Sequence, residues 1–189
     1  EVRSSLSNPT PQIGALYKVT NEVSAFATYT KSTEFAGGAD FSGKPVDPID
    51  DLGIDIGIKT TLMDGLVSGT LSYNITRRDH LAATDNAKQN ALGTAPWYIY
   101  NNTAESKGIE ADFNFSLTDS WSLMLGYSHD LQNEITQSST PAQVGLPLGG
   151  VPKDYVTLWS RYDIKSGDLK GYYFTGGMRA SSDARVSPD

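Results

Sequence analysis

Apolar and polar residues alternate along much of the chain, and the segment 66–78 shows the pattern most clearly. Its odd positions include Val67, Leu71 and Tyr73, whereas the even positions from 68 to 76 are serine, threonine and asparagine. A period of two residues is that of a β-strand, in which successive side chains point to opposite faces of the sheet. The segment therefore predicts a strand with one apolar and one polar face.

The same pattern along the whole chain predicts an all-β fold of about eight consecutive antiparallel strands. The predicted strands cover residues 12–18, 23–31, 53–62, 66–78, 105–117, 121–131, 154–164 and 170–180. Hydrophobic residues make up 38% of the chain. No stretch approaches the roughly 18 consecutive apolar residues that a membrane-spanning helix needs.

Three parts of the chain repeat one unit, a short polar turn followed by an alternating strand with a tyrosine near its far end. The copies cover residues 19–30, 62–73 and 117–128. Repetition on this scale indicates an array built from one supersecondary unit. The unit here is a β-hairpin.

The connections between the predicted strands alternate strictly between short and long. The short ones are 19–22, 63–65, 118–120 and 165–169, and the long ones are 32–52, 79–104 and 132–153. Loops that long are uncommon in compact soluble domains. Short turns on one side and long loops on the other are typical of an antiparallel transmembrane β-barrel. A soluble sandwich fits the alternation equally well but leaves this arrangement unexplained.

Six aromatic residues lie on the apolar faces of the predicted strands, at two distances from the short turns. Tyr17, Trp121 and Tyr162 are near the turns, and Tyr29, Tyr73 and Tyr127 are further along their strands. A tilted strand climbs about 2.5 Å per residue, which separates the two levels by roughly 15–20 Å. Two aromatic levels on an outward face are typical of a barrel with interfacial girdles.

The opposite face carries charged side chains of both signs. The residues expected to face the lumen are Asp55, Lys59, Glu110, Asp112, Arg161 and Arg179. Unpaired charges are costly in a dry core, but they suit a wet lumen wall or the surface of a polar domain that fills the lumen. On this interpretation the apolar face meets outer-membrane lipid.

Composition and motifs point away from catalysis and from nucleic acid. The chain has 189 residues and a formal net charge of −7. It has no cysteine, and this absence excludes a disulfide scaffold and thiolate metal sites. Its two histidines, His80 and His129, have no second ligand at metal-binding spacing. We therefore expect no metal site, no cofactor and no enzyme activity. No basic run interleaved with aromatic residues indicates a nucleic-acid partner.

Several segments, taken in order, resemble TonB-dependent outer-membrane receptors, particularly the siderophore receptors. The hairpin formed by residues 8–29 resembles a barrel hairpin of this family, and residues 57–77 are similar to its next strand pair. The segment 105–112, ESKGIEAD, resembles the recurrent E-x-x-G-x-E-x-[DE] strand, and 151–154, VPKD, resembles an N/V-P-[RK] strand. The match covers nearly the whole chain.

The resemblance implies that residues 1–189 form part of one barrel domain in the bacterial outer membrane, a segment of a larger, roughly 22-stranded barrel. Against that pattern the N-terminal plug and the final strands are absent, so we expect two unpaired sheet edges. The implied function is active uptake of a ferric siderophore, energised by the TonB complex through the missing N-terminal part. Iron would arrive only as part of the siderophore.

Other functions stay open on the sequence alone. The same machinery with another cargo, such as cobalamin or an oligosaccharide, fits the same residues. A small outer-membrane barrel acting as an adhesin or structural protein is a further alternative, and so is a soluble carbohydrate-binding β-sandwich. An upstream plug-coding region would favour transport over the small barrel, and partitioning into detergent would separate both from the soluble sandwich.

The expected loop 79–104 holds the strongest candidates for ligand contact, Trp97, Tyr98 and Tyr100. Exposed aromatic rings at a barrel mouth stack on ring-containing ligands or on an iron-chelate shell, but they equally suit a small loop core or the upper girdle. If the three residues contact the ligand, replacing them with alanine in the full receptor will weaken ligand binding. Unchanged affinity in a correctly assembled barrel would remove them from the site.

Overall fold

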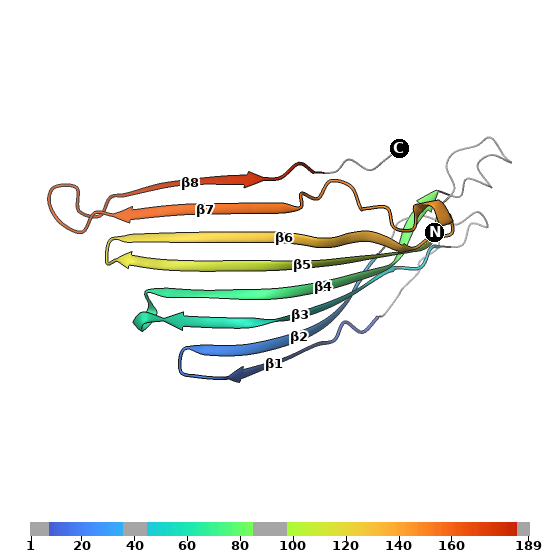
Figure 1. The fold of residues 1–189 in the computed structure, drawn as a ribbon, viewed down its shortest axis with the longest axis horizontal. Coiled ribbons are helices and arrows are strands. Elements are labelled where there is room, and N and C mark those ends of the chain that lie inside the picture. The colour runs from blue at the N-terminus through green and yellow to red at the C-terminus, as the bar shows by residue number, and fades with distance from the viewer. Residues whose placement is uncertain (1–7, 36–44, 85–97, 185–189) are drawn as a thin grey trace, which may run out of the picture.

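The chain forms one antiparallel sheet in which the strands follow their order in the sequence (Figure 1). This computed structural model describes residues 8–35, 45–84 and 98–184. The strands are β1 (Gln12–Lys18), β2 (Val23–Glu34), β3 (Ile49–Leu62), β4 (Val67–Thr84), β5 (Tyr98–Thr118), β6 (Trp121–Gln137), β7 (Asp154–Asp163) and β8 (Tyr173–Ser181). Two single-turn 3-10 segments, η1 (Met63–Gly65) and η2 (Pro141–Gln143), complete the elements. The predicted all-β fold and strand order are confirmed.

The strands in the middle of the sheet extend further toward the loop side than the sequence predicted. The strand expected at 66–78 runs to Thr84, and the strand expected at 105–117 begins at Tyr98. The strict alternation of apolar and polar residues ends in these extensions, where Asp79, Asn102 and Thr103 interrupt it, yet the backbone ladder continues. The expected long loops are therefore shorter, and part of each is strand.

The short turns are fixed by local hydrogen bonds and by backbone conformation. In the β1–β2 turn the Thr20 hydroxyl oxygen accepts hydrogen bonds from the backbone N–H groups of Glu22 and Val23, at 3.1 and 3.0 Å. In the β3–β4 turn Asp64 and Gly65 have φ of 53° and 93°, the left-handed region that glycine adopts at little cost. Figure 1 shows that the short turns are staggered, each hairpin reaching further than the one before it.

The register gathers most of the apolar side chains of the eight strands on one face, whereas Phe26 and Trp159 lie on the other. Ile58, Leu71 and Ala111 are successive cross-strand partners, as are Ile56 and Tyr73. This face has no dry interior, because Ile56 is 53% exposed and Leu71 is 41% exposed. We call it the apolar face, and it includes all six aromatic residues predicted to form two levels.

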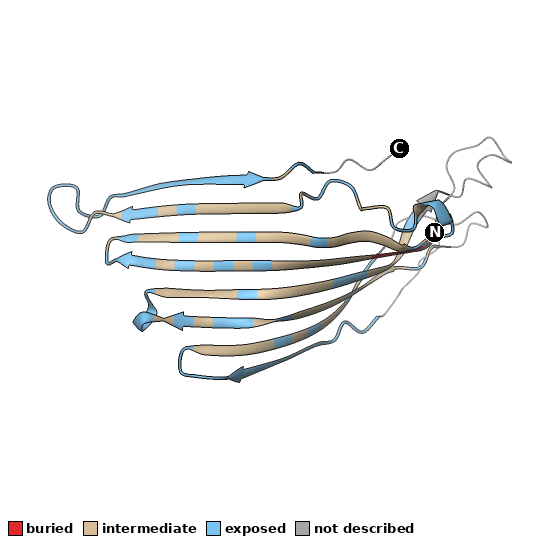
Figure 2. Cartoon of the chain, in the orientation of Figure 1, coloured by how far each residue is buried: buried red, intermediate tan, exposed pale blue. Residues whose placement is uncertain are grey.

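The sheet lacks a core within the described part of the chain. The buried residues there are Asn102, Thr103 and Ala104, which are 5%, 4% and 1% exposed, and all lie on β5 near the loop side (Figure 2). The edge strands β1 and β8 are exposed along their whole length, and each pairs with a single neighbour. The two unpaired edges expected from the sequence are present among these residues.

Gly69 lies on the apolar face directly opposite Phe113, and its missing side chain makes room for the ring. A Cβ atom at Gly69 would collide with the Phe113 ring and lie 2.5 Å from the Asp112 carbonyl oxygen. We predict that Gly69→Ala lowers the free energy of unfolding of the intact protein by about 1–3 kcal/mol through overpacking. Urea unfolding in detergent micelles measures this change.

Gly176 on β8 is the matched control, since it lies on the same face and a Cβ atom there would meet nothing within 4 Å. Gly176→Ala should leave the unfolding midpoint nearly unchanged. Equal destabilisation by the two substitutions would show that the Phe113 contact does not set the cost.

Candidate functional site

The face opposite the apolar one carries the charged residues that the sequence assigned to a lumen. Successive partners in one row across β3 to β8 are Lys59, Thr70, Asp112, Gly126, Thr157 and Arg179. Asp55, Glu110 and Arg161 lie an even number of residues from members of this row, so they share its face. We call this the polar face. That it lines a lumen stays a prediction.

The charges in the middle of the polar face do not pair with one another. Asp55 accepts a hydrogen bond from the Thr28 hydroxyl at 2.9 Å, and the Lys59 ammonium lies 5.3 Å from the centre of the Phe26 ring. Arg179 donates a hydrogen bond to the Tyr155 hydroxyl at 3.4 Å and has no carboxylate partner among the residues that the structure describes. Charged groups arranged in this way suit water or a polar occupant in front of the sheet.

Arg161 is the exception, because it already has a carboxylate partner on its own strand. Its Nε and Nη2 atoms donate to Asp163, the shortest contact being 2.7 Å. The guanidinium also lies 4.2 Å from the centre of the Tyr173 ring. Arg161 is therefore held in place before any ligand or domain approaches.

On the loop side of the sheet, ion pairs join neighbouring strands. Arg78 donates to Asp51 at 2.8 Å and to Glu34 at 3.0 Å, which joins β4 to both β3 and β2. Arg77 forms a two-atom contact with Asp79 on its own strand, at 3.1–3.2 Å. These pairs explain why the ladder persists where the apolar pattern has ended.

Asp79 connects this network to the buried part of β5. It accepts a hydrogen bond from the Thr103 hydroxyl at 2.7 Å in addition to those from Arg77. Partial burial acts to raise the pKa of Asp79, but the hydrogen bonds from Arg77 and Thr103 outweigh it and hold the pKa below its usual value. The ionised carboxylate is thus part of the folded rim.

The β6–β7 connection folds back onto the strand ends instead of projecting away from them. Leu146 and Leu148 exchange backbone hydrogen bonds with β6 at Ile135 and Asn133, both 3.0 Å long. The Gln143 side chain accepts hydrogen bonds from Ser138 at 2.8 Å and from Asn102 at 3.4 Å. The connection therefore covers β5 where Asn102, Thr103 and Ala104 are buried.

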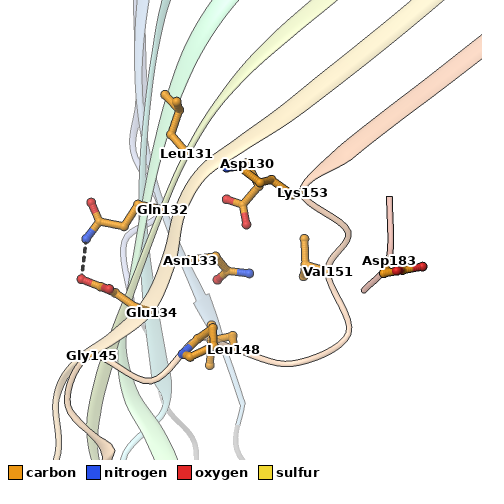
Figure 3. A pocket seen from close by; sticks show the side chains of 11 residues that line it. Asp130, Leu131, Gln132, Asn133, Glu134, Gly145, Leu148, Val151, Lys153 and Asp183 are labelled. Atoms are coloured by element: carbon orange, nitrogen blue, oxygen red, sulfur yellow. Dashed lines mark hydrogen bonds between the residues drawn. The ribbon is translucent and has the colours of Figure 1, made fainter. Parts of the chain in front are cut away.

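A cavity of about 240 Å³ lies between this connection and the loop-side end of β6 (Figure 3). Asp130 and Asn133 line it from β6, Leu148 and Val151 from the connection, and Asp183 from the segment after β8. Partial burial raises the pKa of Asp130 above its usual value. The cavity is large enough for one polar group of a ligand, and its walls offer carboxylate, amide and apolar contacts.

The aromatic candidates for ligand contact fall at the limit of what the structure describes. Trp97 lies outside the described residues. Tyr98 and Tyr100 belong to the start of β5, where they pair with Thr84 and Ala82 of β4. They are therefore strand residues rather than loop residues, and a ligand-binding role for the cluster stays a prediction.

The two histidines each bond to a single protein group. The Nδ1 atom of His80 lies 3.1 Å from the Pro48 carbonyl oxygen, and that of His129 lies 2.7 Å from Asp154. Across residues 8–35, 45–84 and 98–184, no three His, Cys, Asp or Glu side chains are placed to hold a metal ion. In the same ranges no helix is long and apolar enough to span a membrane.

Sequence reasoning missed the cavity and the buried cluster, because both depend on how the β6–β7 connection folds. The signals in the sequence are weak: Pro141 begins the single turn η2, and Gly145 and Gly150 have φ of 85° and 86°. These residues mark bends, but they do not indicate which strands the connection packs against.

Comparison with known proteins gives consistent matches along the chain. The family model described as TonB dependent receptor-like, beta-barrel matches residues 2–188. The metal-pseudopaline receptor CntO of Pseudomonas aeruginosa is 32% identical over 162 residues, which are 86% of this chain and 22% of that protein. The ferric-pyoverdine 358 receptor of Pseudomonas putida is 25% identical over 178 residues, 94% of this chain and 21% of that protein.

A solved structure agrees with these matches. The crystal structure of the ferripyoverdine receptor of the outer membrane of Pseudomonas aeruginosa, bound to ferripyoverdine, superposes with a TM-score of 0.70 at 26% identity. The superposition covers 90% of this chain and 22% of that one. The chain thus spans about a fifth of the length of the relatives it matches.

The lowered pKa of Asp79 predicts a loss of rim stability in acid. A carboxylate whose pKa is lower in the folded state stabilises the fold above its unfolded pKa, and this contribution is lost as the pH falls through the folded pKa. We predict that amide protection at residues 102–104 in the intact protein decreases below about pH 4. Hydrogen-exchange mass spectrometry, corrected for the intrinsic exchange rate, measures the protection.

Asp79→Asn should weaken the same amides at neutral pH and remove most of the pH dependence. Asp119→Asn in the short β5–β6 turn, at the opposite end of the sheet, serves as the control and should leave both unchanged. Identical pH profiles for the natural protein and Asp79→Asn would exclude Asp79 as the group responsible.

Proposed function

The chain belongs to the TonB-dependent receptor β-barrel family, and from this premise we propose that it is part of a receptor for active uptake of a ferric siderophore. Members of this family are outer-membrane β-barrels of Gram-negative bacteria, so the chain is an outer-membrane protein. The family is one of receptors rather than enzymes. We propose that its function involves no bond chemistry on the cargo.

One observation carries the proposal: the sheet gathers most of its apolar side chains on one face and the charges of its middle on the other, without forming a core among the described residues. Only a closed barrel or a helix satisfies every backbone polar group inside a bilayer, and a barrel strand that crosses it has one lipid-facing and one lumen-facing side. The apolar face, with Ile56 and Leu71, meets lipid. The polar face, with Lys59 and Asp112, lines the lumen.

The nature of the cargo is supported by the relatives. The matched proteins are receptors for metal-pseudopaline and for ferric pyoverdine, which are metal chelates. Iron is then cargo and not a resident cofactor, and the receptor requires no metal site of its own. Uptake of cobalamin or of an oligosaccharide is the alternative within the same family.

The missing parts of the receptor determine how transport is driven. Residues 1–189 correspond to about a fifth of the relatives' length, so we assign them to one partial barrel domain. The plug and the contact with the TonB complex would lie in the N-terminal part of the full protein. The unpaired charges on the polar face, Asp112 and Arg179 among them, suit contact with such a domain.

An uptake assay tests the proposal directly. The full-length receptor, expressed in an iron-starved host that lacks its own siderophore receptors, should accumulate radioactive iron supplied as ferric pyoverdine or another defined ferric siderophore. Accumulation should stop when TonB is inactivated, because the barrel itself supplies no energy. The same receptor with radioactive cobalamin, and the host without the receptor, are the controls.

Two results would contradict the proposal in different ways. Iron accumulation that persists without TonB would refute energised transport. Uptake of cobalamin or of an oligosaccharide, with none of the ferric siderophores taken up, would leave the receptor class intact and replace the cargo.

A further inference from the structure

We propose that the polar face of β7 and β8 carries a binding site for a flat ring that bears a negative charge. The ring stacks on the indole of Trp159, and its charge pairs with the guanidinium of Arg179. The inference rests on the proposed function, because cargo reaches this face only if the face lines the lumen. It adds which chemical group of a metal chelate this part of the wall holds.

The site is an open groove of about 350 Å³ on the polar face of the two strands. Tyr155, Thr157 and Trp159 line it from β7, and Gly177 and Arg179 line it from β8. Among the described residues that line the groove, Arg179 is the charged one. Largely uncharged walls with a single cation suit a ligand that has one flat apolar part and one anionic part.

The register makes Trp159 and Arg179 neighbours on this face. Trp159 pairs directly with Gly177, and Arg179, two residues further along β8, pairs with Thr157. Side chains that are diagonal to each other in this way start about 7–8 Å apart, which long and aromatic side chains can bridge. A ring stacked on the indole can therefore extend a carboxylate toward the guanidinium.

The position of the indole depends on the missing side chain of Gly177. A Cβ atom there would collide with the six-membered ring of Trp159 and lie 2.7 Å from the Leu158 carbonyl oxygen. The indole thus packs against the backbone of β8, yet Trp159 is still 48% exposed. One side of the ring is supported by the sheet and the other is open, as a stacking surface requires.

Two other aromatic rings of the polar face already have a cation against them. The Lys59 ammonium lies 5.3 Å from the centre of the Phe26 ring, and the Arg161 guanidinium lies 4.2 Å from the centre of the Tyr173 ring. Trp159 has no such cation among the described residues. Its open ring face is therefore available to a ligand.

Arg179 complements Trp159, because it is a cation without a carboxylate in the described part of the chain. The Tyr155 hydroxyl accepts a hydrogen bond from its Nη1 atom at 3.4 Å, which orients the guanidinium without neutralising it. Arg161 differs, since Asp163 accepts hydrogen bonds from its Nε and Nη2 atoms. An anion in the groove thus meets the guanidinium of Arg179, the side chain type whose geometry best matches a carboxylate.

These two residues together select the class of ligand. A neutral flat ring would leave Arg179 without an anion, and an anion without a ring would leave the indole of Trp159 exposed. A ring that carries a carboxylate or an ionised phenol oxygen satisfies both groups at once. The groove therefore favours the aromatic, anionic part of a chelate over its aliphatic or uncharged parts.

Fluorine NMR on the full-length receptor in detergent micelles tests the site, with 4-fluorobenzoate as the probe. The dissociation constant is obtained from the change of the fluorine signal during titration. We expect Arg179→Gln to raise it about tenfold, because a charge-assisted hydrogen bond is lost. Trp159→Leu, which keeps an apolar side chain but removes the ring, should raise it about threefold or more.

Lys59→Gln is the matched control for charge. Lys59 lies in the same cross-strand row as Arg179 but five strands away, which is about 24 Å. Its replacement removes one positive charge from the same face and should leave the dissociation constant unchanged. Arg179→Lys keeps the charge and should recover part of the binding that Arg179→Gln loses.

Three competitors separate the contribution of the ring from that of the charge. Benzoate, which has both, should displace 4-fluorobenzoate. Cyclohexanecarboxylate has the charge without the flat ring, and benzamide has the ring without the charge, so both should displace the probe poorly. Unchanged mobility of the unheated variants on SDS gels shows that each barrel has folded.

Several results would overturn the site. They are equal dissociation constants for the natural receptor, Arg179→Gln and Trp159→Leu, an equal loss of binding in Lys59→Gln and Arg179→Gln, and no binding of the probe to the natural receptor. Displacement by cyclohexanecarboxylate as efficient as that by benzoate would also overturn it.

Iron accumulation, measured separately on the natural receptor, distinguishes failure of the site from failure of the proposed function. A receptor that takes up a ferric siderophore but fails the probe test has the proposed function without this site. A receptor that binds the probe as expected but takes up no ferric siderophore has the ring-binding site, and the proposed function is then wrong.

Discussion

The structure depends on one constraint, the fixed register of a continuous antiparallel hydrogen-bond ladder. Because side chains alternate along a strand, a slip of one residue between any two strands would move apolar side chains to the polar face. The observed register pairs apolar with apolar positions at every strand boundary, from Ile58 and Leu71 to Leu125 and Leu158. The sheet is thereby two-sided, and it achieves this without a buried core.

Charged side chains in the middle of the sheet differ from those at its loop-side edge in whether they have a partner. Halfway along the polar face, Lys59, Asp112 and Arg179 have no ion-pair partner among the described residues. At the edge of the apolar face, Lys107 and Arg77 are each bound to a carboxylate. Water or a polar domain can satisfy the first group, whereas a charge beside hydrocarbon has to bring its own partner. Loop-side charges of the polar face are paired as well, since Arg78 is bound to Asp51 and Glu34, so pairing marks the loop side of both faces.

The sequence was sufficient to predict the strand order and the division of residues between the two faces, because both follow from the alternation of apolar and polar residues with a period of two. It was not sufficient for the strand ends. Residues such as Asp50, Asp51 and Arg78 look like loop residues, yet they continue the ladder because ion pairs and hydrogen bonds replace apolar contacts there. The burial of Asn102 and the cavity at Asp130 could not be predicted, since both arise where a distant connection folds onto the strands.

On the proposed function, we expect cargo to meet this chain at its loop-side rim. There the β6–β7 connection is fixed to β6 by backbone hydrogen bonds, and the cavity at Asp130 opens between them. Nearer the middle of the sheet, the polar face carries charges such as Asp112 and Arg179 that have no ion-pair partner among the described residues. We propose that a plug domain of the full receptor, and not this rim, supplies the movement that transport needs.

An experimental structure of the full-length protein in a lipid nanodisc is the most direct test of the two-sided sheet. The account predicts Ile56, Leu71 and Phe113 on the outer wall against lipid, with Lys59 and Asp112 inside. A structure in which Ile56, Leu71 and Phe113 pack into a shared dry interior would contradict it.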